Sequence, residues 1–386
     1  MNRTLEHWLN HALDRRVTWG LPWRGHVIPA FQLWAGLGLT LATVAALALA
    51  GVRGLSAAWM ATAIAAAAAA CFVFALGYKV ITGEERLAFL HHVGLAIGAA
   101  TLVLRGTAEP LLAYVEIVAV CFGLLLAVGR LGCLYAGCCH GRPHHWGVRY
   151  GERHVEAGFP PSMQGIRLVP VQLLESGWAG LVSAACLIAL AAGAPTGLTL
   201  ACLLPLYALG RFGAELLRGD SVRTWWGPLS EAQWICIGLS MASLLGQGYG
   251  GLPSSSLSAG LAASALVPML AAIASRRMRE WAQPFHPRDM IAIAEAVRME
   301  DAPGPLAVRS TRRGWQFSRG WIKAGEASCM HWAVSGFPGE PRLLGSLARL
   351  LIRLEGLPDD TPIRVDPSRS VTHILAFPAG LREESS

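Results

Sequence analysis

The chain has 386 residues, of which 53% are hydrophobic and only 15% are charged, and it carries a formal net charge of +7. Soluble domains hold about 25% charged residues, so this composition excludes an ordinary soluble protein and indicates a membrane protein. The arginines are spread among apolar segments and form no basic stripe, which argues against a nucleic-acid partner.

Charged residues are concentrated toward the C-terminus. Residues 281–386 hold 13 of the 32 lysines and arginines and 12 of the 25 acidic residues. This step in charge density predicts a membrane part followed by a water-soluble part. We therefore predict an N-terminal amphipathic segment at 1–25, a transmembrane domain at 26–279 and a soluble domain at 280–386.

The first residues predict an amphipathic helix over 4–16, because Leu5, Trp8, Leu9 and Leu13 share one helical face. Such a helix lies on a membrane surface or packs on the protein itself. The charged and aromatic start of the chain has no apolar core or cleavage site, so we expect no signal peptide.

Eight later segments are apolar enough to be membrane-spanning helices, which need about 20 residues each. We expect an all-α polytopic bundle of seven or eight transmembrane helices, followed by a small α/β domain. The third segment is the shortest, and the eighth is followed by a basic stop at 276–279. The segments are 29–50, 56–78, 87–104, 110–129, 171–192, 196–217, 230–247 and 257–275.

Two regions outside these segments carry local signals. In the polar loop 137–170, Trp146-Gly147 and Tyr150-Gly151 favour ordered strand or turn structure. The tail predicts helices at 288–299 and 342–356 and strands at 329–334 and 371–377. It also predicts two paired strands, 315–317 and 321–323, around a turn at Ser318-Arg319-Gly320.

Ionisable residues occur near the ends of three predicted spans. Arg211, Glu215 and Arg218 share one helical face through i,i+4 and i,i+3 spacing, and so do Gln172 and Glu175. Arg130 ends the fourth span within Gly129-Arg130-Leu131-Gly132. Charges inside spans face the bundle interior. Arginines interleaved with carboxylates suit a bound phosphate group, and the alternative is a set of ion pairs that only holds the helices together.

Three of the nine cysteines and a histidine follow Arg130, at Cys133, Cys138, Cys139 and His140. This spacing lacks the Cys-x2–4-Cys pair of a structural zinc site, although His144 and His145 could complete a ligand set. We expect these cysteines to act as small packing residues, and we expect neither a metal nor a cofactor.

Together these motifs resemble the prolipoprotein diacylglyceryl transferase family over about 87–247. The resemblance rests on Gly129-Arg130-Leu131-Gly132 with Gly137 and Gly141, on Pro170-x-Gln172-Leu173-x-Glu175, on Tyr207-x3-Arg211-Phe212-x2-Glu215-x2-Arg218-x-Asp220, and on Leu229-Ser230-x2-Gln233. The chain departs from the commoner family pattern at Cys133, Cys138 and Val169, where Asn, Glu and His are usual.

The resemblance implies a multi-pass enzyme of the inner (plasma) membrane. It would transfer diacylglycerol from phosphatidylglycerol to the lipobox cysteine of a prolipoprotein and release glycerol phosphate. Arg130 and Arg211 would be catalytic, and His92, in a shortened His-Gly-Gly motif, would be the base. The expected substrate-binding residues are Gly132, Gly137, Gly141, Arg142, Gln172, Glu175, Tyr207, Glu215 and Arg218.

Two questions stay open at this stage. Positively charged loops predict that 137–170 faces the cytoplasm, whereas the resemblance places it on the periplasmic side. The rival functions are a non-catalytic lipid or anion carrier and a transferase with a different acceptor.

Overall fold

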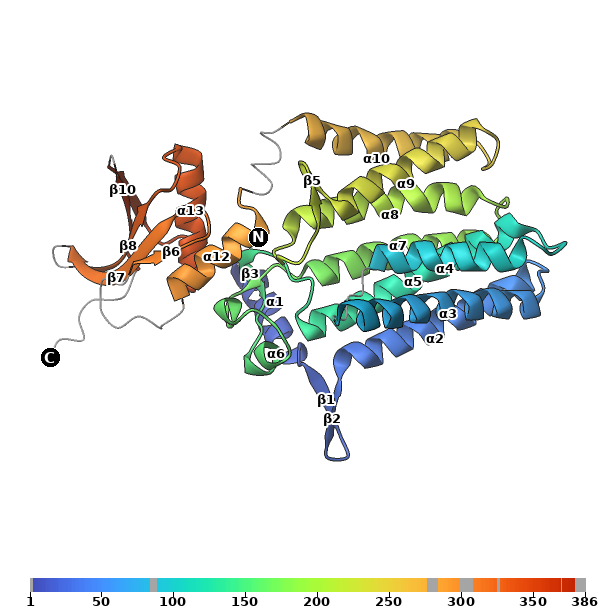
Figure 1. Cartoon of the computed structure of the whole chain (residues 1–386), viewed down its shortest axis with the longest axis horizontal. Coiled ribbons are helices and arrows are strands. Elements are labelled where there is room, and N and C mark those ends of the chain that lie inside the picture. Colours follow the sequence, from blue (N-terminus) through green and yellow to red (C-terminus); the bar gives the residue numbers. More distant parts are fainter. Residues whose placement is uncertain are drawn as a thin grey trace.

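A computed structural model describes residues 3–83, 89–275, 284–298, 308–324, 327–368 and 370–378. It confirms the predicted fold class, a helical membrane bundle joined to a small sheet domain (Figure 1). The predicted basic stop at 276–279 and the predicted boundary between 279 and 280 lie outside the described residues.

All eight predicted spans are helices. Six of them are long and apolar enough to cross a membrane, namely α2, α3, α5, α7, α8 and α10. Two others, α4 and α9, complete the bundle, and the apolar part of α4 is the shorter stretch His92–Leu104. The bounds are α2 Ala30–Val52, α3 Ala57–Thr82, α4 Phe89–Leu104, α5 Leu111–Ala136, α7 Val171–Ala191, α8 Leu198–Leu217, α9 Glu231–Gly248 and α10 Ser256–Ala274.

Successive helices of the bundle run in opposite directions (Figure 1). The C-terminal end of α5 and the N-terminal end of α7 therefore lie at the same end as the loop between them. Helix α5 is central, because it packs on both α2 and α7. Small residues allow this close packing: a Cβ on Gly132 of α5 would lie 3.2 Å from the Phe31 Cα of α2.

The loop at 137–170 is ordered, as the aromatic-glycine pairs predicted. It contains strand β3 (Pro143–Val148), helix α6 (Glu152–Glu156) and a 3-10 turn, η1 (Pro161–Met163). Two short hairpins lie elsewhere in the chain and were not predicted: β1 Gly20–Trp23 with β2 His26–Pro29, and β4 Trp225–Trp226 with β5 Leu229–Ser230.

Helix α1 (Arg3–Arg16) confirms the predicted N-terminal helix and packs on this loop. The Asn10 side chain accepts a 2.9 Å hydrogen bond from Gly147 N, and Asp14 forms a 2.8 Å ion pair with Arg167. The structure thus has the helix packed on the protein's own surface, while Leu5 and Trp8 remain exposed.

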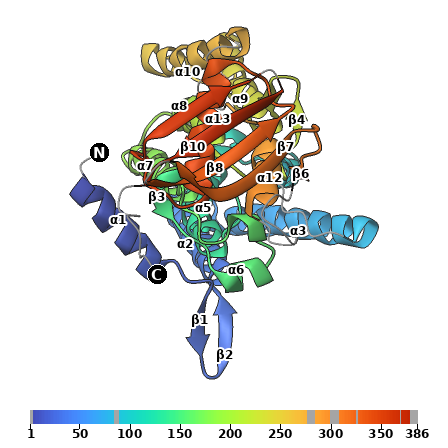
Figure 2. The same cartoon turned by 90° about the vertical axis from the view of Figure 1, so that its left-hand side faces the viewer.

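The tail is a five-stranded antiparallel sheet in the order β6-β7-β8-β10-β9, with helices α12 and α13 packed against it (Figure 2). Both predicted helices and the strands at 329–334 and 371–377 are confirmed. The elements are α12 Pro287–Arg298, β6 Arg309–Ser310, β7 Gln316–Ala324, β8 Ala327–Ser335, α13 Pro341–Leu354, β9 Ile363–Pro367 and β10 Val371–Ala376.

One predicted feature of the tail is wrong. Residues 315–323 do not form two strands around a turn, because β7 runs through Ser318-Arg319-Gly320 and pairs with β8 along its whole length. Gly320 lies opposite His331 in this register and keeps an extended backbone. The predicted turn at this glycine is therefore a continuous part of strand β7.

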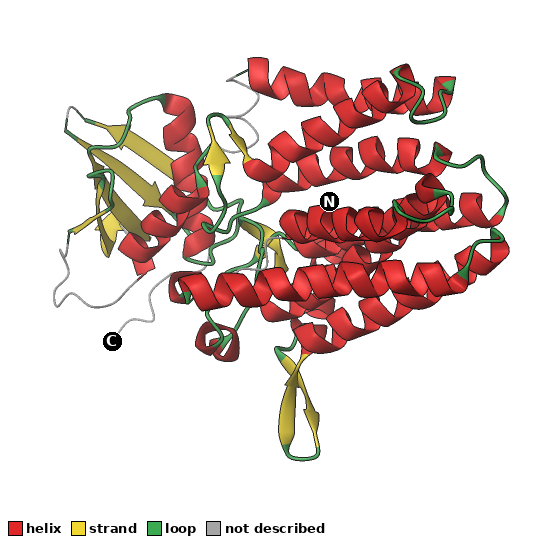
Figure 3. Cartoon of the chain, turned by 45° about the vertical axis from the view of Figure 1, so that its right-hand side comes forward, coloured by secondary structure: helices red, strands yellow, loops and turns green. Residues whose placement is uncertain are grey.

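The tail and the loop share one hydrophobic core. Tyr150, Phe159 and Met163 of the loop pack in the same cluster as Ile293 of α12 and Leu351 of α13. Arg298 donates 2.9 Å hydrogen bonds to the carbonyls of Ser162 and Gln164. The tail therefore sits on the end of the bundle that carries the 137–170 loop (Figure 3).

Candidate active site

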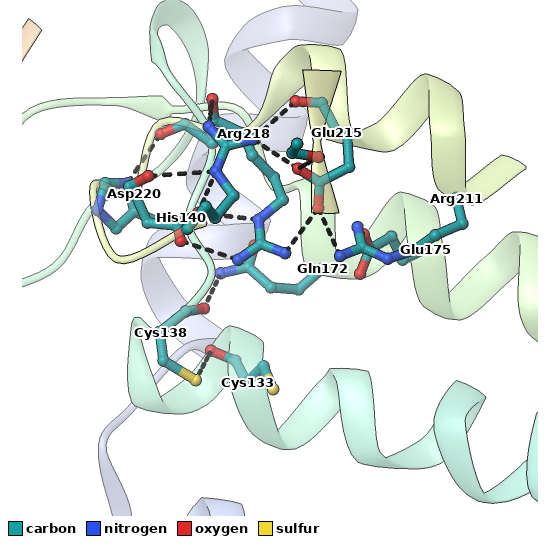
Figure 4. A network of polar contacts seen from close by, with 12 residues as sticks. Cys133, Cys138, His140, Gln172, Glu175, Arg211, Glu215, Arg218 and Asp220 are labelled. Atoms are coloured by element: carbon teal, nitrogen blue, oxygen red, sulfur yellow. Dashed lines mark hydrogen bonds and ion pairs between the residues drawn. The ribbon is translucent and has the colours of Figure 1, made fainter. Parts of the chain in front are cut away.

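A chain of ion pairs joins three helices at this end of the bundle. Figure 4 shows Glu175, Arg211, Glu215, Arg218 and Asp220 of this chain. Arg130 Nε of α5 lies 2.7 Å from Glu175 Oε2 of α7. The other oxygen of Glu175 accepts from Arg211 Nη1 of α8 at 2.5 Å, and Arg211 Nη2 lies 2.5 Å from Glu215 Oε1. The structure therefore brings together the four side chains that were predicted to converge, namely Arg130, Arg211, Glu175 and Glu215.

The chain of ion pairs continues into the segment after α8. Glu215 also pairs with Arg218 at 3.0 Å and with Arg223 at 2.6 Å. Asp220 accepts two 2.8 Å hydrogen bonds from Arg218. Although burial opposes its charge, the negative charges of Cys139, Asp220 and Glu215 raise the pKa of Arg218, so this guanidinium stays charged.

We call these seven side chains the arginine network. Each of them is less than 9% exposed, so all of their charge is removed from bulk water. Buried charges are stable only when they are paired, which explains the number of carboxylates. There is one more arginine than there are carboxylates, an imbalance that favours an anionic ligand. The network consists of Arg130, Glu175, Arg211, Glu215, Arg218, Asp220 and Arg223.

Three buried polar groups in and beside the network have unused hydrogen-bonding capacity. Arg130 Nε lies 2.7 Å from Glu175 Oε2, yet it forms no hydrogen bond among the described residues. The Tyr207 hydroxyl and Gln172 Oε1 are both buried without a hydrogen-bond partner. Unsatisfied buried polar groups are rare in proteins, so these groups are candidates to bind a polar ligand.

Gln172 connects the network to the 137–170 loop. Its Nε2 donates to the Cys138 carbonyl at 2.8 Å and lies 3.3 Å from the Tyr150 hydroxyl. That hydroxyl in turn donates to the Leu134 carbonyl at 3.0 Å, and burial raises the pKa of Tyr150, so it stays protonated. Gln172 therefore holds the chain just after α5 in a fixed position.

The predicted glycines pack against protein. Gly132 lies against α2, and Gly137 caps α5 in the left-handed region at φ +78°. A Cβ on Gly141 would overlap the Val169 carbonyl, and the Gly141 backbone pairs with Arg218. These glycines allow the loop to approach α8 and α7 closely. Their predicted contact with substrate stays a prediction.

Two further predicted residues lie against other elements. Arg142 is partly buried, and burial together with the nearby charge of Arg353 in the tail lowers its pKa. His92 lies against α3, where its ring meets Phe74 edge-on at 5.3 Å and its carbonyl accepts from the Cys71 thiol. The role of His92 as a base stays a prediction.

The three cysteines after Arg130 come together. The sulfur atoms of Cys133, Cys138 and Cys139 all lie within 4.8 Å of one another. Hydrogen bonds from Cys133 and Cys138, and then the charges of Arg218 and Arg130, lower the pKa of Cys139. His140 is not part of this group of thiols. Its Nδ1 donates to the Gly141 carbonyl at 2.9 Å, and burial lowers its pKa.

Arg223 was not predicted from the sequence as part of this site. Its guanidinium binds the Glu215 carboxylate and donates to the carbonyls of Glu215, Arg218 and Asp220. The Ser230 hydroxyl also donates to Glu215 at 3.2 Å. Only the Leu229-Ser230-x2-Gln233 motif pointed to this region, where Ser230 and Gln233 form the capping box that begins α9.

A family model described as prolipoprotein diacylglyceryl transferase matches residues 31–248. The match runs from α2 to α9 and includes all of the arginine network, whereas the tail lies outside it. A comparison with curated protein sequences finds no match. Because the family model covers more than half of a chain whose helices fit a multi-pass membrane protein, this chain belongs to the prolipoprotein diacylglyceryl transferase family.

Proposed function

We propose that the protein transfers the diacylglyceryl group of phosphatidylglycerol to the thiol of a lipobox cysteine in a prolipoprotein and releases glycerol phosphate. The observation that carries this proposal is the excess of arginines over carboxylates in the buried arginine network. Arg130 is 6% exposed and shares the carboxylate of Glu175 with Arg211, so one carboxylate serves two buried guanidiniums. A phosphate would supply the further negative charge, and its oxygens match the two parallel N–H donors of an arginine.

The chemistry of the transfer follows from this arrangement. The acceptor thiolate attacks the glycerol carbon that carries the phosphate ester, and the carbon–oxygen bond breaks. The leaving glycerol phosphate gains negative charge, which Arg130 and Arg211 stabilise because they are already fixed in place by Glu175 and Glu215. The Tyr207 hydroxyl has no hydrogen-bond partner and lines the same small cavity as Glu175 and Arg211, which supports a role as a further donor to this phosphate.

The residues serve different purposes in this scheme. Arg130 and Arg211 are catalytic, and Glu175 and Glu215 are positioning residues. Gln172, Gly137 and Gly141 shape the loop that covers the site. His92 is the proposed base, the bundle at 26–279 is the proposed transferase domain, and the plasma membrane is the proposed location.

A reconstituted assay tests the function. Full-length protein in nanodiscs containing labelled phosphatidylglycerol is mixed with a lipobox peptide, and lipidated peptide and glycerol phosphate are measured. We expect both products in equal amounts, and we expect Arg130→Ala and Arg211→Ala to lower the rate by at least about 100-fold. Arg130→Lys should lose most of the rate too, because lysine lacks the planar fork.

The matched control is Arg105→Ala, an exposed arginine at the opposite end of the bundle, which should leave the rate unchanged. Lipid binding without release of glycerol phosphate would refute the transferase and favour a lipid carrier. Full activity of Arg211→Ala would refute the proposed site.

A further inference from the structure

The three thiols after Arg130 form a site with an unusual geometry for cysteines in a membrane bundle. Their sulfur atoms lie within 4.8 Å of one another, and none of the three forms a disulfide. Four thiolates around zinc sit at about 2.3 Å from the metal, which places neighbouring sulfurs about 3.8 Å apart. Small side-chain rotations would therefore bring these three sulfurs onto one ion.

The backbone that produces this cluster has an uncommon conformation. Cys133 lies in the last turn of α5, after which Gly137 at φ +78° and Cys139 at φ 56° both take the left-handed region. A non-glycine residue with positive φ is uncommon. The chain therefore turns sharply between Cys133 and Cys139, which lets the three thiols face one another.

The surroundings favour thiolate ligands and leave access from outside. Arg130 precedes Cys133 by three residues on α5, and the backbone of Arg218 pairs with that of Gly141, two residues after Cys139. The positive charges of these two arginines offset the negative charge of bound thiolates. Cys138 is exposed, whereas Cys133 and Cys139 are half-buried, so the cluster opens to solvent on one side. His145 instead lies 2.9 Å from Glu6 and is not a member of the cluster.

From this geometry we infer that Cys133, Cys138 and Cys139 bind a zinc ion whose fourth position receives the acceptor thiol. Three protein ligands with one open position are typical of catalytic zinc sites, whereas structural sites are closed by four ligands. A thiol that coordinates zinc is deprotonated, which turns it into the nucleophile. The inference rests on the proposed function, because it names the group that activates the acceptor.

The step balances without any oxidant or reductant. On coordinating zinc, the acceptor thiol would lose its proton to water, and this step would replace the base role proposed for His92. Its sulfur then forms a bond to the glycerol carbon, and the electron pair of the broken carbon–oxygen bond leaves with the glycerol phosphate. Arg130 lies about one turn before Cys133 on the same helix. The arginine that holds the phosphate and the zinc ligands that hold the thiol are therefore neighbours.

Metal analysis tests the site without reference to activity. Full-length protein, purified with a tag that contains no histidines, should contain about one zinc per chain. Cys133→Ser, Cys138→Ser and Cys139→Ser should each lower the zinc content to background, whereas the control Cys202→Ser, in α8, should keep it. Metal-free wild-type protein with three titratable thiols at this site, or serine variants that retain zinc, would overturn the inference.

Cobalt substitution tests the open position. The Co²⁺ protein should show thiolate-to-cobalt charge transfer and the visible bands of a tetrahedral site. A lipobox peptide should shift these bands, and the same peptide with serine in place of cysteine should not. Bands that do not respond to saturating cysteine peptide would overturn the assignment of the fourth position to the acceptor.

The two proposals fail in different ways. If zinc-free Cys138→Ser protein lipidates the peptide at the wild-type rate, the zinc inference is wrong and the transferase stands. If the cysteine peptide shifts the cobalt bands but no diacylglyceryl group moves, the thiol-binding zinc site stands and the proposed reaction is wrong.

Discussion

Arg130 of α5 and Arg211 of α8 bind the two different oxygens of one carboxylate, that of Glu175 on α7, at 2.7 and 2.5 Å. Glu175 thus fixes the distance between two guanidiniums that would otherwise repel each other. All three side chains are less than 9% exposed, so water contributes little screening. The relative position of the two arginines depends on this single residue.

Removing that charge should affect both stability and activity. Glu175→Gln keeps the shape of the side chain but leaves two buried guanidiniums without their shared partner. Breaking a buried ion pair in this way costs about 3–5 kcal/mol, so we expect a clearly lower midpoint of thermal unfolding in detergent and a large loss of transfer rate.

The control for this variant is Asp366→Asn, which removes an exposed ion pair with Arg364 in the tail. Exposed pairs contribute about 0–1 kcal/mol, so its unfolding midpoint should barely change. A Glu175→Gln protein as stable and active as the wild type would show that the arginines hold their positions without it.

Arg223 should matter although it lies outside the spans. It reaches back from the segment after α8 to Glu215 and to three backbone carbonyls, so Arg223→Gln frees the 218–224 segment from α8. We expect faster proteolysis of this segment and a lower kcat with little change in KM for the peptide. Arg149→Gln, at an exposed arginine of the other loop, provides the comparison. Unchanged proteolysis of Arg223→Gln would contradict the anchoring role.

Regular periodicity explains which parts of the site were predictable. Arg211 and Glu215 are i,i+4 on one helix, and Gln172 and Glu175 are i,i+3 on another, so sequence spacing alone placed each pair on one face. Arg130 could be added because charges in spans face the interior. The length and apolar character of eight segments predicted the helices of the bundle.

Contacts made through irregular backbone were not predictable in the same way. Arg223 meets Glu215 only because the chain folds back after α8, and no spacing rule describes that path. The convergence of the three thiols was not predictable either, because the left-handed backbone at Gly137 and Cys139 that brings them together leaves no periodic signal. Gly320 was predicted to form a turn, but glycine also occurs inside strands, as it does here in β7.

Gly141 should not tolerate a side chain. Its Cβ position coincides with the Val169 carbonyl and contacts Val171, both rigid parts of the chain. Overpacking typically costs about 1–3 kcal/mol, and a backbone obstacle allows little relaxation, so Gly141→Ala should lower the unfolding midpoint and displace the loop from Arg218. Gly151→Ala, whose Cβ meets nothing within 4 Å, should have no such effect. Equal stability of the two variants would contradict the close packing of the loop.

The orientation of the bundle gives the last prediction. The 137–170 loop, the β4–β5 hairpin and the tail lie at one end, because α10 returns the chain to it (Figure 1). An epitope tag inserted at Gly227 and another after Ser386 should therefore be detected together, whereas a tag in the turn between α4 and α5 should behave in the opposite way. If the C-terminal tag is detected on the same side of the membrane as the α4–α5 tag, then α10 does not cross the membrane.

We further expect the Gly227 and C-terminal tags to be accessible in intact spheroplasts, on the periplasmic side. The positive-inside rule counts arginines that are free to interact with the membrane surface and the insertion machinery. Arg218 and Arg223 are buried in ion pairs with Glu215, and Arg167 is paired with Asp14, so these residues should not be counted. Detection of both tags only after permeabilisation would place the arginine network on the cytoplasmic side and would contradict this expectation.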